Sequence, residues 1–188
     1  PEPISTGKFN TDVALKLQEE GHQVTVLCSH PFYPDWKTRY SSEKLEGITI
    51  IRGGNKIKYP NKISLRRIVL EIWYALFILK NIKKNQNKID VIIPVFPPSL
   101  AFYTASFFIK KEIKKIGIIH DLQIIYSSQK KGLFNKLITF FIKRVEKSCF
   151  KTCDTLIFLS EEMKNAALDI YKISKIKCQV QFPFTTIK

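Results

Sequence analysis

The sequence predicts an α/β protein built on a doubly wound, Rossmann-like parallel sheet with helices on both faces. Short apolar runs alternate along the chain with amphipathic segments of about 12–20 residues, the order that parallel strands and their crossover helices produce. The apolar runs are almost uninterrupted and rich in Val and Ile, as in strands that are covered on both faces. Hydrophobic residues make up 45% of the 188 residues, which is enough to form a core of ordinary size.

The first third of the chain begins with an amphipathic segment. Residues 8–20 predict a helix, because Phe9, Val13 and Leu17 fall on one face and Gly21 ends the pattern. The next expected elements are β-strands at 23–28 and 48–52, with a long loop at 29–47 between them.

The rest of the chain continues the alternation of helices and strands. The longest helix is expected where apolar residues recur with a spacing of three and four after residue 64. The expected elements are helices at 64–85, 97–115, 133–151 and 160–172, strands at 89–95, 116–120, 154–159 and 176–182, and a loop that ends near residue 132.

The basic charge is uneven along the chain. The formal net charge is +15, from 31 Lys and Arg against 16 Asp and Glu. Lys accounts for 26 of the basic residues, as an A+T-rich gene could supply, but such a bias does not explain where the charge lies. Residues 52–88 hold ten basic residues and one acid, residues 108–151 hold eleven and three, and residues 1–50 hold five and seven. This excess points to nucleic acid, a lipid surface or a phosphorylated ligand as partner.

Other features exclude several classes of protein. The four cysteines, Cys28, Cys149, Cys153 and Cys178, form no CxxC pair, and Cys149 and Cys153 have no histidine close in sequence, so no metal site is expected. Four scattered cysteines are typical of free thiols in a reducing compartment. The longest purely apolar run, residues 72–79, is far shorter than the ~20 residues that span a bilayer.

Four loops are candidates for chemistry, because ligands of open α/β sheets bind beyond the carboxyl ends of the strands. The first loop holds Thr6, Gly7 and Lys8, just before the first helix. A glycine at a helix N-terminus lets backbone N–H groups approach a phosphate, whereas on spacing alone Gly7 is more typical of an ordinary turn residue.

The second loop reads HPFYPDW, at residues 30–36. Aromatic rings between prolines form a rigid surface on which a sugar or a lipid can pack, so Tyr33, Asp35 and Trp36 are candidates for binding such a ligand. The alternative is a loop that burial of its aromatic rings simply holds in place.

The third and fourth loops follow neighbouring apolar runs. Phe96 and Ser99 are candidates in the third, where a serine that caps a helix is the ordinary alternative. His120 and Asp121 end the strand IGIIH in the fourth. The aspartate could orient the imidazole or accept a hydrogen bond from a ligand hydroxyl, whereas a lone histidine such as His22 is usually structural.

Taken in order, these motifs resemble the N-terminal domain of retaining glycosyltransferases of family four, which have the two-domain GT-B fold. The HPFYPDW loop is similar to the branch that builds cell-surface polysaccharides such as O-antigen, capsule and colanic acid. The matching stretches are Pro1-Glu2, Thr6–Phe9, Leu17–Thr25, Pro31–Trp36, Leu45–Ile48, His120–Leu122, Leu159–Lys164 and Phe182-Pro183.

The resemblance implies transfer of a sugar from a nucleotide-sugar donor to an acceptor, which in this family is often linked to a lipid. It implies that Gly7, with Thr6 and Lys8, lies against the donor phosphates and that His120 and Asp121 lie near the transferred sugar. The residues expected to bind the acceptor are Tyr33, Asp35, Trp36, Phe96 and Ser99. It also implies no metal or other cofactor, because basic side chains and a helix N-terminus neutralise the donor phosphates.

The resemblance further implies the organisation of the chain. Residues 1–182 are expected to form the acceptor-side domain and residues 183–188 to begin the linker to a C-terminal, donor-binding domain. PEPISTGKF resembles the loop that follows a first strand, so that strand is expected ahead of residue 1. On this interpretation the 188 residues are inactive as a transferase on their own.

The charge then favours a membrane partner. The helices expected at 64–85 and 133–151 combine basic residues with broad apolar surfaces, as helices in an anionic membrane interface do. A cytoplasmic protein held peripherally on the inner face of the cell membrane is therefore expected. The alternatives are two core helices with solvated lysines, a non-catalytic subunit that docks on a membrane or a partner, and a basic nucleic-acid-binding module.

Overall fold

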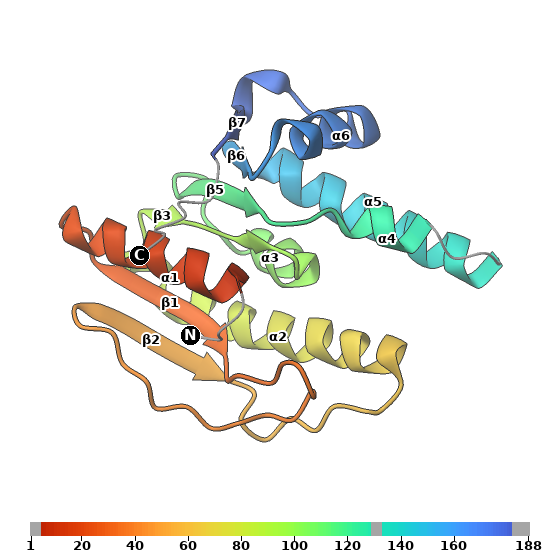
Figure 1. Cartoon of the computed structure of the whole chain (residues 1–188). Helices are drawn as coiled ribbons and strands as arrows, with labels where there is room; N and C mark the ends of the chain where they lie inside the picture. Colours follow the sequence, from red (N-terminus) through yellow and green to blue (C-terminus); the bar gives the residue numbers. More distant parts are fainter. Residues whose placement is uncertain (1–4, 129–132, 182–188) are drawn as a thin grey trace. The chain divides into compact units, whose positions relative to one another are not determined.

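The computed structural model describes residues 5–128 and 133–181 (Figure 1). The chain forms two compact units, Pro1–Phe77 and Ile78–Lys188. Each unit contains a parallel sheet with helices against it, which confirms the predicted Rossmann-like α/β class.

The first unit is built on a two-stranded sheet. Its elements are α1 (Ser5–Glu19), β1 (Val24–Ser29), β2 (Ile48–Gly53) and the first part of α2 (Ile63–Asn85). The two strands are parallel and pair over their whole length, from Val24 opposite Ile48 to Ser29 opposite Gly53. Tyr74 of α2 donates its phenolic hydrogen to the carbonyl of Leu27 at 3.0 Å, which fixes α2 against β1.

Two glycines allow the end of β2 to pass close to α2. A Cβ atom on Gly53 would lie 2.7 Å from the ring of Phe77, and one on Gly54 would lie 2.7 Å from the ring of Trp73. Gly54 also has a φ of +82°, which favours glycine. A larger residue at either position would push α2 away from the sheet.

The second unit is built on a larger parallel sheet. Its elements after α2 are η1 (Gln86–Lys88), β3 (Val91–Ile92), β4 (Val95–Phe96), α3 (Ser99–Ser106), β5 (Lys114–Ile119), α4 (Gln123–Ser128), α5 (Leu133–Thr152), β6 (Thr155–Phe158), α6 (Glu161–Tyr171), η2 (Lys175–Lys177) and β7 (Cys178–Val180). The strand order is β3-β5-β6-β7, with β4 also paired to β5 (Figure 1).

Aromatic rings form the centre of the second core. Phe96, Phe150 and Tyr171 are fully buried. Phe150 meets Phe96 and Tyr171 edge to face, with ring centroids 5.5 Å and 5.1 Å apart. These contacts join α5 and α6 to the sheet, because the three rings come from β4, α5 and α6.

The structure corrects three predicted boundaries in the second unit. The strand expected at 89–95 is divided into β3 and β4, because Pro94 has no N–H to donate to β5 although its carbonyl accepts from Ile118. The helix expected at 97–115 ends at Ser106, since Lys114 and Lys115 pair with β3 instead. The loop expected after residue 120 contains the short helix α4.

Candidate functional site

One edge of the second sheet brings together four of the candidate residues. Phe96 lies opposite Ile119 in the pairing of β4 with β5, and Ile119 lies opposite Phe158 in the pairing of β5 with β6. Because parallel strands end at the same edge, the segments that contain Ser99 and His120 leave the sheet side by side. The N-terminal end of α6 follows β6 at this edge as well.

His120 is held at this edge by its backbone. Its N–H donates to the carbonyl of Phe96 at 2.9 Å, so the end of β5 is tied to the end of β4. The side chain is half-buried, and burial lowers the pKa of His120 below 6.5. The imidazole is therefore neutral at pH 7, with one ring nitrogen that donates a hydrogen bond and one that accepts.

Asp121 stabilises the turn that leads away from the sheet. One of its carboxylate oxygens accepts the N–H of Leu122 at 2.8 Å, and the side chain remains half-buried. Leu122 itself is buried, so it anchors the segment that carries the two polar residues. The neutral imidazole and the carboxylate can together hold the hydroxyl groups of a polar ligand.

Glu146 of α5, which is not among the residues expected from the sequence, supports the same segment from within the core. One carboxylate oxygen accepts the N–H of Gln123 at 3.0 Å, and the other accepts a short hydrogen bond from the hydroxyl of Tyr171. The side chain is fully buried. Burial raises the pKa of Glu146, and the nearby Asp121 raises it further, while the hydrogen bonds from Tyr171 and the backbone oppose this shift.

A sequence signal for Glu146 does exist. It is the only acid of α5, and it lies on the face of the helix that also carries Val145, Cys149 and Phe150, all of them buried. An acid on the buried face of a helix needs hydrogen-bond donors around it, and such a residue often holds a neighbouring loop.

The two candidates of the third loop lie under the surface. The ring of Phe96 is fully buried between Phe102 and Phe150, so it supports the sheet and offers no surface to an acceptor. Ser99 is the first residue of α3 and is also buried; its hydroxyl has no hydrogen-bond partner among the described residues. Its carbonyl accepts the thiol hydrogen of Cys149 at 3.4 Å.

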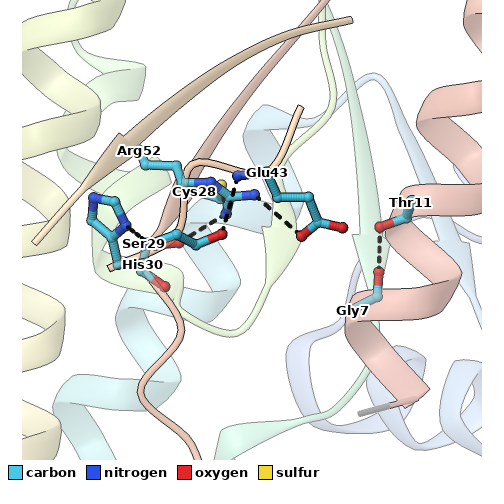
Figure 2. A network of polar contacts seen from close by, with 8 residues as sticks. Gly7, Thr11, Cys28, Ser29, His30, Glu43 and Arg52 are labelled. Carbon is cyan, nitrogen blue, oxygen red and sulfur yellow. Dashed lines mark hydrogen bonds and ion pairs between the residues drawn. The ribbon is translucent and has the colours of Figure 1, made fainter. Parts of the chain in front are cut away.

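The remaining candidates lie in the first unit. The helix α1 begins at Ser5, earlier than predicted, so Thr6, Gly7 and Lys8 belong to its first turn and not to a loop. The carbonyl of Gly7 accepts a hydrogen bond from the Thr11 hydroxyl at 2.8 Å (Figure 2). The first N–H groups of a helix have no acceptor within it, so this turn can still present donors to a phosphate.

The aromatic loop combines an anchored part and an exposed part. The rings of Phe32, Trp36 and Tyr59 form a cluster with centroids 5.1–5.2 Å apart. The guanidinium of Arg66 covers the Trp36 ring, 4.6 Å from its centroid. Tyr33 is half exposed at the tip. Burial of the rings therefore fixes the loop, while the Tyr33 side chain remains half exposed to solvent.

Asp35 is held beside this tip. Its carboxylate accepts a hydrogen bond from Arg39 at 2.8 Å. Slight desolvation raises the pKa of Asp35, but the backbone N–H of Lys37 and the charge of Arg39 outweigh it, so the net shift is downward. The exposed carboxylate is therefore ionised at neutral pH and can accept hydrogen bonds from hydroxyl groups.

A groove of about 510 Å³ lies over β2 in the same unit. Arg52 extends into it from the strand, with one guanidinium nitrogen 3.4 Å from the Cys28 sulfur and the other 3.9 Å from a carboxylate oxygen of Glu43 (Figure 2). His30 is buried at the edge of the groove, and its Nδ1 accepts the N–H of Ser41 at 3.2 Å. Burial and the nearby Arg52 lower the pKa of His30, so this histidine is neutral at pH 7.

The described residues contain no cluster of three or more His, Cys, Asp or Glu side chains placed to hold a metal ion. All four cysteines are free thiols, as the sequence predicts. Within residues 5–128 and 133–181, none of the helices combines the length and the apolar character that crossing a bilayer requires.

Comparison with known proteins identifies the family. A fold of parallel strands with polar residues at their carboxyl ends defines the class of Rossmann-like, ligand-binding domains. Residues 6–183 match the family model described as Glycosyltransferase Family 4, so the chain belongs to this family of sugar transferases. A search of curated proteins gave no match.

Proposed function

We propose that the chain is the acceptor-side domain of a retaining glycosyltransferase that transfers a sugar from a nucleotide donor to a lipid-linked acceptor during synthesis of a cell-surface polysaccharide. The observation that carries this proposal is the family match over residues 6–183, together with His120 and Asp121 at the carboxyl end of β5. The resemblance of the HPFYPDW loop supports the polysaccharide role.

In this proposal the polar edge of the second unit binds the transferred sugar. Neutral His120 exchanges hydrogen bonds with sugar hydroxyls, and Asp121 orients the segment while accepting from a further hydroxyl. Glu146 positions both residues through the N–H of Gln123. Fixed donors and acceptors of this kind assist the reaction because they need no reorganisation when the glycosidic bond to the leaving diphosphate breaks.

The candidates of the first unit have roles of their own in this proposal. The first turn of α1, with Thr6, Gly7 and Lys8, contacts the donor phosphates through its free N–H groups. Tyr33 and Asp35 form the acceptor surface, since an exposed ring can pack against the C–H face of a sugar and an ionised carboxylate accepts from its hydroxyls. Trp36, packed against Phe32 and Tyr59, holds the loop that carries them. Basic side chains and the helix N-terminus balance the phosphate charge, so no metal is required.

The lipid-linked acceptor implies a membrane location, and we propose a peripheral attachment to the cytoplasmic face. The net charge of +15 supports it, because an anionic lipid surface attracts basic proteins at about 1 kcal/mol for each Lys or Arg near it. The donor nucleotide is proposed to bind mainly to a separate domain of the complete enzyme, in keeping with the resemblance to two-domain transferases.

The test is a transfer assay with a panel of nucleotide sugars and a lipid extract that contains polyprenyl-diphosphate-linked sugars. The full-length product of the gene is expected to move sugar from at least one donor to the lipid fraction, and the 188-residue chain alone to move none. Absence of transfer from every donor by the full-length product would contradict the proposal. Turnover of a donor by the 188 residues alone would contradict the division of roles.

A further inference from the structure

The helix α5 exposes large apolar side chains to solvent. Leu137 is 65% exposed, and Phe140 and Phe141 are each 58% exposed. They are three and four residues apart, so they lie on one side of the helix, where Phe140 and Phe141 are also next to one another. Exposure of neighbouring phenylalanines on one helix marks an interaction surface and not ordinary surface composition.

The same side of α5 carries only positive charge. Lys136, Lys143 and Arg144 are exposed, and Arg144 lies 5.8 Å from the centre of the Phe140 ring. The only acid in the helix is Glu146, which is fully buried and bonded to Tyr171. The exposed side therefore offers aromatic rings among cations, with no carboxylate from α5 itself.

The opposite side of α5 provides its attachment to the protein. Val145, Cys149 and Phe150 are buried there, and Glu146 bonds to α4 and α6 from the same side. The helix is thus held in place without using its exposed rings. They remain available to a partner outside the second unit.

We propose that the exposed side of α5, from Lys136 to Lys147, is the surface by which the protein docks on an anionic membrane. In such an interface phenylalanine and leucine side chains enter the boundary between headgroups and acyl chains, while lysine and arginine meet the lipid phosphates. This inference rests on the proposed function, because a lipid-linked acceptor must be reached from the membrane surface.

The charge pattern selects this occupant over a second copy of the chain. Two copies that met through α5 would bring cations against cations, and like charges at an interface are strongly unfavourable. Anionic lipid is complementary along the whole surface. A nucleic acid would contact the cations, but it would not require Leu137 and the two phenylalanines to enter an apolar phase.

A second exposed apolar stripe on α2 is a weaker candidate. Leu65, Ile68, Ile72 and Leu76 are exposed there. The span of the stripe, residues 65–76, has two cations, Arg66 and Arg67, against four in residues 136–147 of α5. Arg66 is engaged over the Trp36 ring, and the acid Glu71 lies in the same span. The stripe itself contains no aromatic residue. We therefore assign docking to α5, and α2 serves as a comparison in the test.

The test is co-flotation of the 188-residue chain with phosphatidylcholine vesicles that contain about 30% phosphatidylglycerol, compared with pure phosphatidylcholine. The chain is expected to float with the anionic vesicles only, and to be released when about 1 M salt shortens the screening length to about 3 Å. The double variant Phe140→Ser/Phe141→Ser is expected to lower the partition coefficient roughly tenfold or more, since the favourable free energy of moving two phenylalanine rings out of water is lost. The variant Lys143→Gln/Arg144→Gln is expected to lower it by a similar factor.

Matched controls come from another exposed segment. Ile176 is 96% exposed, and Lys175 beside it is exposed as well. Ile176→Ser and Lys175→Gln therefore remove an apolar and a cationic side chain at a site outside α5. Both are expected to float like the parent chain. Circular dichroism checks that every variant is folded.

A second measurement does not depend on loss of binding. In Phe140→Trp the new tryptophan is expected to shift its emission to shorter wavelength with anionic vesicles and to be quenched by brominated acyl chains, whereas Ile176→Trp is not. The proposal is overturned if the phenylalanine variant floats normally, if neutral vesicles bind equally well, or if only the cation variant loses binding, which would indicate a surface contact without insertion. Loss of binding in Ile72→Ser/Leu76→Ser but not in the α5 variants would overturn the proposal and assign the docking surface to α2. Since flotation needs no sugar donor, this outcome is independent of the transfer assay.

Discussion

Tyr171 of α6 donates its phenolic hydrogen to the carboxylate of Glu146 on α5, and both side chains are completely buried. The other carboxylate oxygen accepts the N–H of Gln123, three residues after His120. One buried carboxylate thus joins α4, α5 and α6 behind the candidate sugar-binding edge. Burial and the charge of Glu146 raise the pKa of Tyr171, so the phenol stays protonated and remains a donor.

Removal of the Tyr171 hydroxyl is expected to destabilise the protein. Tyr171→Phe leaves a buried carboxylate short of one donor, and the loss should be about 1–3 kcal/mol of unfolding free energy in urea denaturation. Tyr40→Phe removes a hydroxyl from an exposed ring and should leave the unfolding free energy unchanged. Equal stability of Tyr171→Phe and the parent chain would show that the bond makes no net contribution.

Sugar transfer is expected to depend on His120 and not on His22. His120→Ala in the full-length product should lower kcat/KM about 100-fold or more, since a positioned hydrogen-bonding group at the reacting sugar is lost. His22 is exposed in the turn between α1 and β1, so His22→Ala removes the same group away from the site and should retain full transfer. Similar rates for the two variants would remove His120 from the site.

The pH dependence of stability should report the burial of His120. Its folded-state pKa lies below 6.5, so the unfolded chain takes up the proton first as the pH falls. The contribution of neutral, buried His120 to the unfolding free energy is complete above about pH 6.5, and it is lost as the pH falls through the folded-state pKa. His120→Asn should therefore lose less unfolding free energy than the parent chain between pH 7 and that pKa. A parallel pH profile for the variant would contradict this assignment.

The close approach of Gly54 to Trp73 should make the end of β2 intolerant of a side chain. Gly54→Ala combines a positive φ with a Cβ 2.7 Å from the Trp73 ring. Gly21 has a φ of +89° but no atom within 4 Å of its Cβ position, so Gly21→Ala measures backbone strain alone. We expect Gly21→Ala to lower the unfolding free energy by about 1–2 kcal/mol because of backbone strain. Gly54→Ala should lower it by at least about 1 kcal/mol more, because its Cβ also meets the Trp73 ring. Equal losses in thermal unfolding would show that α2 adjusts freely.

Thiol reactivity should divide the four cysteines into two pairs. Cys149 and Cys153 are buried, and burial raises the pKa of Cys153 to about 12. Cys28 and Cys178 are partly exposed. At pH 8 a thiol reagent is expected to label Cys28 and Cys178 in the folded chain and all four after unfolding, as mass spectrometry of peptides can count. Rapid labelling of Cys153 in the folded chain would contradict its burial in the turn between α5 and β6.

The sequence was sufficient to predict the bounds of helices and strands where local patterns agree with the packing. β1, β2 and α5 lie within one or two residues of their predicted bounds, because β-branched runs and a clear helical period coincide there with burial. The helix expected at 97–115 was wrong in its second half, since Lys114 and Lys115 are drawn into β5 by pairing with β3. Such pairing depends on residues far apart in the chain, which a local pattern cannot reveal.

In the candidate site too, residues marked by a local pattern were predicted, and residues whose role depends on distant contacts were not. His120 and Asp121 were identified because a polar pair ends an apolar strand, and the structure brings them to the edge that also carries the end of β4. Phe96 was assigned to an acceptor from its position after a strand, but a loop position does not tell whether a ring points into the core. Glu146 was missed because its partners, Gln123 and Tyr171, are 23 and 25 residues away.

Lys177 has a consequence for shortened versions of the second unit. Its ammonium donates to the carbonyls of Phe150, Lys151 and Cys153 at 2.6–3.1 Å, at the end of α5 where those carbonyls have no partner in the helix. A truncation that stopped before Lys177 would retain every residue of α5 yet uncover its C-terminal end. The minimal fragment for structural or vesicle studies should therefore extend through β7.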